Sequence, residues 1–300
     1  MIRKLIDKRN QLRIVGEYQK SDEIRKRLLK EGYQVIDADK GNQIFRFEGT
    51  NLAQPKNSFI VLFGSGEISP FGRKVHQEVF EKIGKDKINL AIITTPAGFQ
   101  PNVKIVYEEI AQFFQDRLQN FHPKIKIIYA NNLNQANDPF LVDQINQSDY
   151  IFTGPGSPTY ASRHLAGSLL LKRIKEKVSS GSSLSLASAA TIAFSGFTLP
   201  VYEIYKVGVD KLFWEKGLDF FKDFLGSITV IPHFNNTEGG EKTDTSRCFV
   251  GRQRFEKLLK LLPQGEGLWG IDEQTGIIID LKTKTKKVIG QGKFYPFQAS

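Results

Sequence analysis

Cysteine is almost absent from this chain of 300 residues, because Cys248 is the only one. A single cysteine excludes an internal disulfide framework and a cysteine-rich zinc site. Histidine is scarce as well, and three of the four, His76, His122 and His164, lack the spacing to a second ligand that metal sites have. We expect these three on helix faces or at the surface, and a reduced, cytoplasmic setting for the protein.

Long apolar runs are also absent. None approaches the roughly 18 residues that a membrane span needs, and the N-terminus, Met1–Leu5, turns charged at once instead of continuing as a signal peptide. We therefore expect no membrane association. With 40% hydrophobic and 11% aromatic residues, the chain can still build a sizeable core, which argues against disorder.

Negative charge is in short supply, since 42 Lys and Arg face 32 Asp and Glu and leave a net charge of +10. Such an excess favours acidic partners, including RNA. The basic residues are spread along the chain, so most are expected on solvated surface. One cluster, Lys282–Lys287, predicts a charged hairpin at the edge of a sheet.

Residues 1–48 differ in pattern from the rest of the chain. Their apolar positions suit two helices, with Ser21 expected to cap the second one. Alternating apolar residues within 33–47 then predict a β-ribbon. This segment holds 12 basic and 8 acidic residues, so its net charge is +4. Residues 49–57 are interpreted as a linker.

The same segment resembles the C-terminal extension of cysteinyl-tRNA synthetases over about 40 residues. The matching residues are Arg9, Leu12-Arg13, Ser21-Asp22-Glu23-Ile24-Arg25, Leu28, Gly32, Val35-Ile36-Asp37 and Gly41. The resemblance implies contact with tRNA or another RNA. The alternative is a basic helical hairpin that packs on the main domain or forms a dimer contact, which leaves a homo-oligomer open.

From residue 58 to 300, short apolar strands alternate with helices. This pattern predicts an α/β domain with a doubly wound, mostly parallel sheet and helices on both faces. Chemistry in such sheets gathers where the strands end. The expected strands are 59–63, 90–93, 126–129, 150–152 and 184–187, and the expected helices are 72–84, 102–118, 159–178 and the segment that begins at Ser188.

Ser188 follows an apolar strand and precedes Ala189 and Ala190. Small residues around a serine at a strand-to-helix turn are typical of a nucleophile elbow, although Leu186 and Ala190 stand where glycines are usual. His233 ends a later strand and could serve as the general base. Separately, Ser188 reads as a helix cap and His233 as a strand-end histidine, but together they favour a hydrolase. The glycine turn Gly64–Glu67 could bind phosphate, yet no P-loop or dinucleotide pattern accompanies it.

Residues 57–300 resemble the serine peptidase family of cyanophycinase and aspartyl dipeptidase, which has the class I glutamine amidotransferase-like fold. The matching motifs are Gly64-Ser65-Gly66-Glu67, Phe152-Thr153-Gly154-Pro155-Gly156, Ser188-Ala189-Ala190, Pro232-His233-Phe234, Gly251-Arg252-Gln253-Arg254 and Gly270-Ile271-Asp272-Glu273. They occur in the family's order and cover about four-fifths of the chain.

The resemblance implies a catalytic triad of Ser188, His233 and Glu203, with Asp272 or Glu273 as alternative acids. It further implies an oxyanion hole and a substrate-binding set. The oxyanion hole would be formed by Ala189 and Gly156, and substrate would be bound by Gly154, Ser157, Arg252 and Arg254.

These residues predict a serine-type hydrolase that cleaves a peptide or amide bond of a small, peptide-like or carboxylate-bearing substrate through an acyl-enzyme on Ser188. Such chemistry needs no cofactor and no metal. Ser157-Pro158 and Leu186 depart from the family pattern, and residues 235–250 look like an inserted lid or substrate loop. These departures make cyanophycin a poor candidate substrate. They also keep open a non-catalytic protein that binds a ligand or peptide in the same cleft.

Overall fold

The computed structural model of the protein describes residues 2–30, 33–38, 41–46 and 58–298. The chain divides into two compact units, Met1–Leu52 and Ala53–Ser300. The predicted linker, 49–57, lies outside the described residues, as does Gly32. In the described chain, no helix is long and apolar enough to cross a membrane.

The first unit contains helices α1 (Ile2–Ile14) and α2 (Tyr18–Lys30) and an antiparallel ribbon of β1 (Tyr33–Ala38) and β2 (Gly41–Arg46). The expectation that Ser21 caps the second helix is wrong. Gly16 adopts a positive φ of 78° and closes the turn between the helices, so α2 begins earlier. Ser21 is therefore an interior, buried residue of α2.

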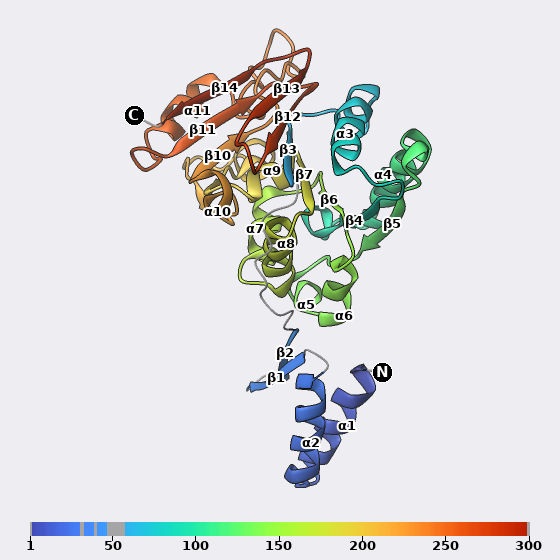
Figure 1. The fold of residues 1–300 in the computed structure, drawn as a ribbon. Helices are drawn as coiled ribbons and strands as arrows, with labels where there is room; N and C mark the ends of the chain where they lie inside the picture. The colour runs from blue at the N-terminus through green and yellow to red at the C-terminus, as the bar shows by residue number, and fades with distance from the viewer. Residues whose placement is uncertain (1, 31–32, 39–40, 47–57, 299–300) are drawn as a thin grey trace. The chain divides into compact units, whose positions relative to one another are not determined.

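The second unit is built on a seven-stranded sheet (Figure 1). Five neighbouring strands of it are parallel, and β12 and β13 join one edge in antiparallel pairing. In order across the sheet, the strands are β13 (Lys286–Gly290), β12 (Thr275–Asp280), β3 (Phe59–Phe63), β7 (Ser183–Ala187), β6 (Tyr150–Thr153), β4 (Asn89–Ile93) and β5 (Lys124–Ile128).

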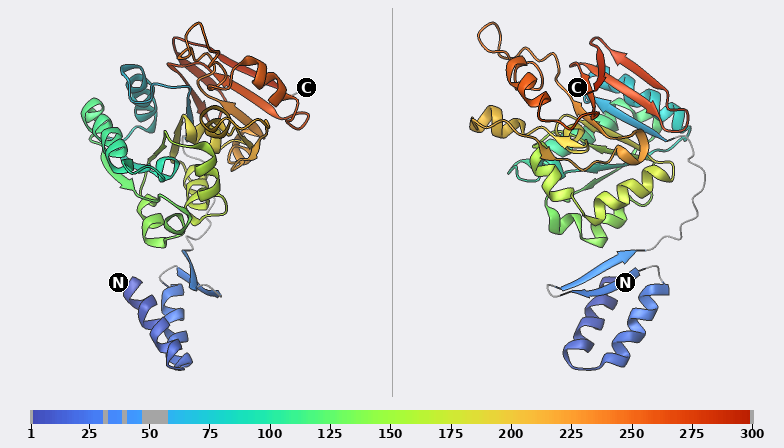
Figure 2. Two further views of the ribbon diagram at one scale, coloured as in Figure 1. Left: turned by 180° about the vertical axis from the view of Figure 1, so that it is seen from behind. Right: turned by 90° about the vertical axis from the view of Figure 1, so that its left-hand side faces the viewer.

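Helices cover both faces of this sheet, as the two views of Figure 2 show. Along β3, Phe59, Val61 and Phe63 pack with α3 (Pro70–Ile83) and α4 (Val103–Arg117). The alternate residues Ile60 and Leu62 pack on the other face with α7 (Pro158–Leu165) and α8 (Leu169–Ser179). Burial on both sides explains why the strands are apolar without interruption. The predicted α/β fold with a mostly parallel sheet is confirmed.

A smaller sheet packs beside the main one. It consists of β10 (Ile228–Ile231), β11 (Gly267–Ile271) and β14 (Phe294–Gln298). Its residues Val230 and Trp269 join the core of the main sheet, whereas Ile231 and Leu268 face α11 (Arg252–Leu259). The remaining short elements are α5 (Leu133–Ala136), α6 (Pro139–Val142), α9 (Ala189–Ala193), α10 (Lys222–Leu225), β8 (Phe197–Thr198) and β9 (Glu215–Lys216), three 3₁₀ turns, and a π-helical segment, Tyr202–Val207.

Two local predictions change. The helix expected over 159–178 is two helices, because Gly167 has a φ of 67° and Ser168 caps α8 by accepting a hydrogen bond from the Leu171 N–H. His76 lies on a helix, as expected, but the face of α3 that carries it is buried and not exposed. By contrast, the charged edge hairpin is confirmed, since β13 is an edge strand and its lysines are exposed.

Candidate active site

Ser188 lies between the end of β7 and the start of α9, with φ 50° and ψ −118°. A residue other than glycine rarely has a positive φ, and the strain is characteristic of functional sites. The small Ala189 and Ala190 are buried behind it, and the Ala190 N–H donates to the Gly154 carbonyl over 3.3 Å. Leu186 points into the core beneath the sheet and does not line the cavity at Ser188, so it leaves the turn uncrowded.

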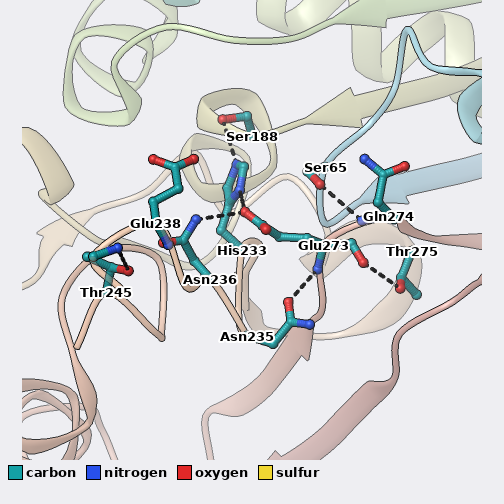
Figure 3. A network of polar contacts seen from close by, with 11 residues as sticks. Ser65, Ser188, His233, Asn235, Asn236, Glu238, Thr245, Glu273, Gln274 and Thr275 are labelled. Atoms are coloured by element: carbon teal, nitrogen blue, oxygen red, sulfur yellow. Dashed lines mark hydrogen bonds and ion pairs between the residues drawn. The ribbon is translucent and has the colours of Figure 1, made fainter. Parts of the chain in front are cut away.

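His233 follows β10 and also has a positive φ, of 52°. Its backbone N–H donates to the Gly64 carbonyl over 3.0 Å, which ties it to the loop after β3. Its ring Nε2 lies 3.3 Å from the Ser188 Oγ (Figure 3). On one side the ring contacts Phe249, with centroids 5.6 Å apart. The predicted serine and histidine therefore meet, although they follow strands of two different sheets, β7 and β10.

The carboxylate on the imidazole comes from Glu273, in the turn between β11 and β12. Its Oε1 lies 2.8 Å from the His233 Nδ1 and also accepts a hydrogen bond from the Asn236 side-chain amide over 2.8 Å. The hydrogen bond from His233 lowers the pKa of Glu273, despite the opposing effect of burial. An ionised Glu273 can only accept, so Nδ1 carries the proton and, in the neutral ring, Nε2 is free to accept from Ser188.

Glu203 does not contact the imidazole, so the expectation that it is the third member of a triad is wrong. It lies on the π-helical segment, where its Oε1 accepts a hydrogen bond from the Thr159 hydroxyl over 2.8 Å. Asp272 is also occupied elsewhere, because its Oδ2 accepts from the Lys293 N–H and the Tyr295 hydroxyl. The turn that follows β11 brings Glu273 to the imidazole. Of the three candidate acids, Glu273 is therefore the one that contacts His233.

The two residues predicted to form an oxyanion hole, Ala189 and Gly156, border the cavity beside Ser188. Within the described residues, neither Ala189 N nor Gly156 N has a hydrogen-bond acceptor, and both residues line the same cavity as Ser188. Gly156 has a φ of 146°, and a Cβ there would stand 2.0 Å from the Pro96 carbonyl oxygen. Only glycine therefore fits this close approach.

The predicted substrate-binding residues lie outside this cavity. The Ser157 hydroxyl caps α7 by accepting from the Tyr160 N–H, and Gly154 is buried. Arg254 donates from Nε to the Val250 carbonyl and lines a separate hollow with Lys257. Arg252 is exposed on the first turn of α11 and does not line the cavity either. The arginine stretch forms the first turn of α11 and does not line the cavity beside Ser188.

The cavity beside Ser188 and His233 has a volume of about 270 Å³. One wall is the π-helical segment, with Tyr202, Tyr205 and Lys206, and another is the predicted inserted loop, with Glu238 and Phe249. Glu238 and Phe249 lie in the loop that the sequence pattern predicts as a lid or substrate loop, whereas that pattern gives no sign of Tyr202, Tyr205 or Lys206. It also assigns no role to Asn236, whose side chain joins the Glu273 carboxylate to the Glu238 N–H.

Among the described residues, no group of three or more His, Cys, Asp or Glu could hold a metal ion. The described site instead consists of a hydroxyl, an imidazole, a carboxylate and two backbone donors. In this set, proton transfer between the serine and the imidazole is the chemistry that the geometry favours.

No family model and no curated protein matches the sequence. Two solved structures that share the fold are peptidases. One is a peptidase from an acI-B1 Actinobacterium, at 22% identity and a TM-score of 0.59, covering 81% of this chain and 99% of its own. Another is a candidate peptidase E protein from Listeria monocytogenes EGD-e, at 14% identity and a TM-score of 0.53, covering 79% of this chain and 100% of its own. At these identities the likeness shows a shared fold.

Proposed function

We propose that this protein is a serine-type hydrolase that cleaves a peptide or amide bond of a small peptide-like substrate. One observation carries the proposal: a serine with a strained backbone has its hydroxyl 3.3 Å from an imidazole whose other nitrogen lies 2.8 Å from a carboxylate. The fold shared with two peptidases supports the same reaction class.

In this mechanism His233 Nε2 accepts the Ser188 proton while Oγ attacks the substrate carbonyl carbon. Glu273 holds the imidazole in the required tautomer and stabilises the imidazolium that forms. The negatively charged oxygen of the tetrahedral intermediate accepts hydrogen bonds from the N–H groups of Ala189 and Gly156. His233 then protonates the leaving amine, and a water activated by the same imidazole releases the acyl group from Ser188.

The resemblance to the cyanophycinase and aspartyl dipeptidase family points to the class I glutamine amidotransferase-like fold for this domain. A serine at position 188 sets it apart from glutamine amidotransferases, which use a thiolate nucleophile. We favour a small peptide with a free carboxylate as the substrate. Among the described residues that line the cavity, Lys206 is the only cation that could pair with that carboxylate.

A fluorophosphonate tests the proposal without knowledge of the substrate. The Ser188 oxygen bonds to phosphorus, fluoride leaves, and the intact mass rises by one adduct. We expect one adduct that maps to Ser188, no adduct with Ser188→Ala, and much slower labelling with His233→Gln. A wild-type protein that remains unlabelled would contradict the proposal and favour a non-catalytic protein that binds a ligand or peptide in the cleft.

For the first unit we propose contact with RNA. The excess of 12 basic over 8 acidic residues in 1–48 supports it, together with the resemblance to a tRNA synthetase extension. We also propose a cytoplasmic location, which the single cysteine, Cys248, supports. Its test is tRNA binding that weakens with salt and is lost when residues 1–52 are removed.

A further inference from the structure

The floor of the cavity beside Ser188 is apolar. Its buried lining side chains are Pro158, Ala189, Ile192, Val201 and Cys248, and none of them carries a charge. A carboxylate or ammonium placed against such side chains would lose its water without gaining a partner, so its binding there is disfavoured. An apolar group placed there would gain from leaving water.

The walls above this floor are aromatic. The rings of Tyr205 and Phe249 face each other with centroids 5.5 Å apart, and Phe249 also contacts the His233 ring. Arg247, Cys248 and Phe249 have φ values of 58°, 59° and 67°, so a left-handed turn holds Phe249 in this position. Three successive strained residues are costly, and such strain persists where the surrounding structure fixes it at a functional site.

The charges of the cavity lie at its rim. Lys206 and Glu238 are both exposed, and neither makes an ion pair with another described residue. The Lys206 ammonium instead lies 5.0 Å from the centre of the Tyr205 ring. Arg252 and Arg254, which the resemblance assigns to a substrate carboxylate, do not line the cavity. A charged group of the substrate therefore meets its partner at the mouth and not at the floor.

We propose that the side chain next to the bond that is cleaved is apolar, of leucine or phenylalanine type, and not acidic. This inference rests on the proposed serine hydrolase function. The cavity, at about 270 Å³, is smaller than the roughly 300–1,000 Å³ of pockets for drug-sized ligands, so it suits one side chain. The apolar side chain of the substrate would bind between the apolar floor and the aromatic walls. The charged terminus of a short peptide would pair with Lys206 or Glu238 at the rim.

Matched aminoalkyl diphenyl phosphonates test the side chain directly. In each, the Ser188 oxygen bonds to phosphorus, phenoxide leaves, and the serine proton passes through His233 to give phenol. We would compare isobutyl, benzyl and carboxymethyl side chains by the rate of the intact-mass shift at pH 7. The isobutyl and benzyl probes are expected to react roughly tenfold faster or more than the carboxymethyl probe, since the floor offers no partner to a carboxylate.

Three variants sharpen this comparison. Val201→Lys places a cation at the floor and is expected to favour the carboxymethyl probe, whereas the isosteric Val201→Thr keeps the original order. Arg252→Ala removes a cation outside the cavity and is expected to change no rate by more than about twofold, as a surface substitution. A wild-type circular dichroism spectrum and labelling of Ser188 by the fluorophosphonate show that each variant is folded with a reactive serine, and the rates of the three phosphonates are compared within each variant.

The outcomes separate this inference from the function on which it rests. If the fluorophosphonate labels Ser188 but the carboxymethyl probe reacts as fast as the isobutyl probe, the apolar assignment is overturned and the hydrolase stands. The same holds if Arg252→Ala selectively slows the carboxymethyl probe. If the fluorophosphonate fails to label Ser188, the hydrolase proposal falls, and the assignment falls with it.

Discussion

At the scale of single residues, Ser188 shows how much of the site is held under strain. Its φ of 50° is one that glycine adopts freely and serine does not. The hydroxyl that makes this residue useful therefore has a conformational cost, which the packing of β7 and α9 around it must offset.

Replacing Ser188 by glycine should make the strain measurable. Relief of the backbone is worth roughly 1–3 kcal/mol, and the added freedom of the unfolded chain costs about 0.4–1 kcal/mol. Ser188→Gly is therefore expected to be about 1 kcal/mol more stable than Ser188→Ala, which keeps the strain. Urea unfolding of the two inactive variants measures the difference, and equal stability would contradict the strain argument.

Substitution of Glu273 tests which of the three candidate acids acts on His233. Glu273→Gln leaves the shape of the site but removes the anion that fixes the His233 tautomer. We expect fluorophosphonate labelling to slow by a factor of about 10²–10⁴, the usual range for general acid–base groups. Glu203→Gln, a matched change at a carboxylate that does not contact His233, should alter the rate by less than about fivefold. The reverse result would restore Glu203 as the acid.

His76 predicts a dependence of stability on pH. Burial lowers its pKa to about 3, and its Nε2 donates to the Glu67 carbonyl while Nδ1 accepts from the Tyr150 hydroxyl. The unfolded state takes up a proton near pH 6.5 and the folded state does not, so stability falls as the pH drops from about 6.5 toward 3.

The expected slope is up to about 1.4 kcal/mol per pH unit. Urea unfolding between pH 7 and pH 5 measures this slope. His164, whose pKa burial also lowers, and Glu67, whose pKa burial raises, contribute to the total, so the wild-type protein is compared with His76→Gln. In His76→Gln the slope should be reduced, whereas an unchanged slope would assign it to other groups.

At the scale of elements, the site depends on loops at the strand ends that approach one another closely. The loop after β6 meets the loop after β4 where the Ser157 N–H donates to the Pro96 carbonyl, and Gly156 makes this approach feasible. The contact between the two loops therefore sets the position of the Gly156 N–H. The residues next to Gly156 in the sequence do not set it by themselves.

Gly156→Ala is expected to displace this loop and to reduce fluorophosphonate labelling by a factor of about 10²–10³, the usual loss for one oxyanion donor. Gly208→Ala provides the control. It also has a positive φ, of 76°, but nothing lies within 4 Å of its added Cβ, so labelling should persist. Equal loss in both variants would mean that backbone strain, and not the Pro96 contact, matters.

At the scale of the whole molecule, the chain divides into two compact units. The second unit contains the entire candidate site and its own core on both faces of the sheet. A chain of residues 53–300 is therefore expected to fold and to react with fluorophosphonate at a rate within about twofold of the full chain, because domains with their own core fold independently. Circular dichroism and intact mass check this, and an unfolded product would show that the first unit is required.

Local patterns in the sequence determined the five parallel strands, the helices α3, α4 and α9, and the positions of the serine and the histidine, but not β11 or β14. Apolar periodicity reflects which faces are buried, and small residues after Ser188 reflect a tight turn. Both are properties of neighbouring residues. For the same reason, the pattern missed the break at Gly167 and the burial of His76, where packing between elements decides.

Only the tertiary structure decided which carboxylate meets the imidazole and which side chains surround the serine. Parallel pairing of β10 with β11 places the turn that follows β11 beside the end of β10, so Glu273 reaches His233 and Glu203 does not. The packing of α11 likewise leaves Arg252 and Arg254 outside the cavity, whereas Lys206 lies at its mouth. Spacing along the chain contains no information on such contacts, because they depend on how separate elements pack together.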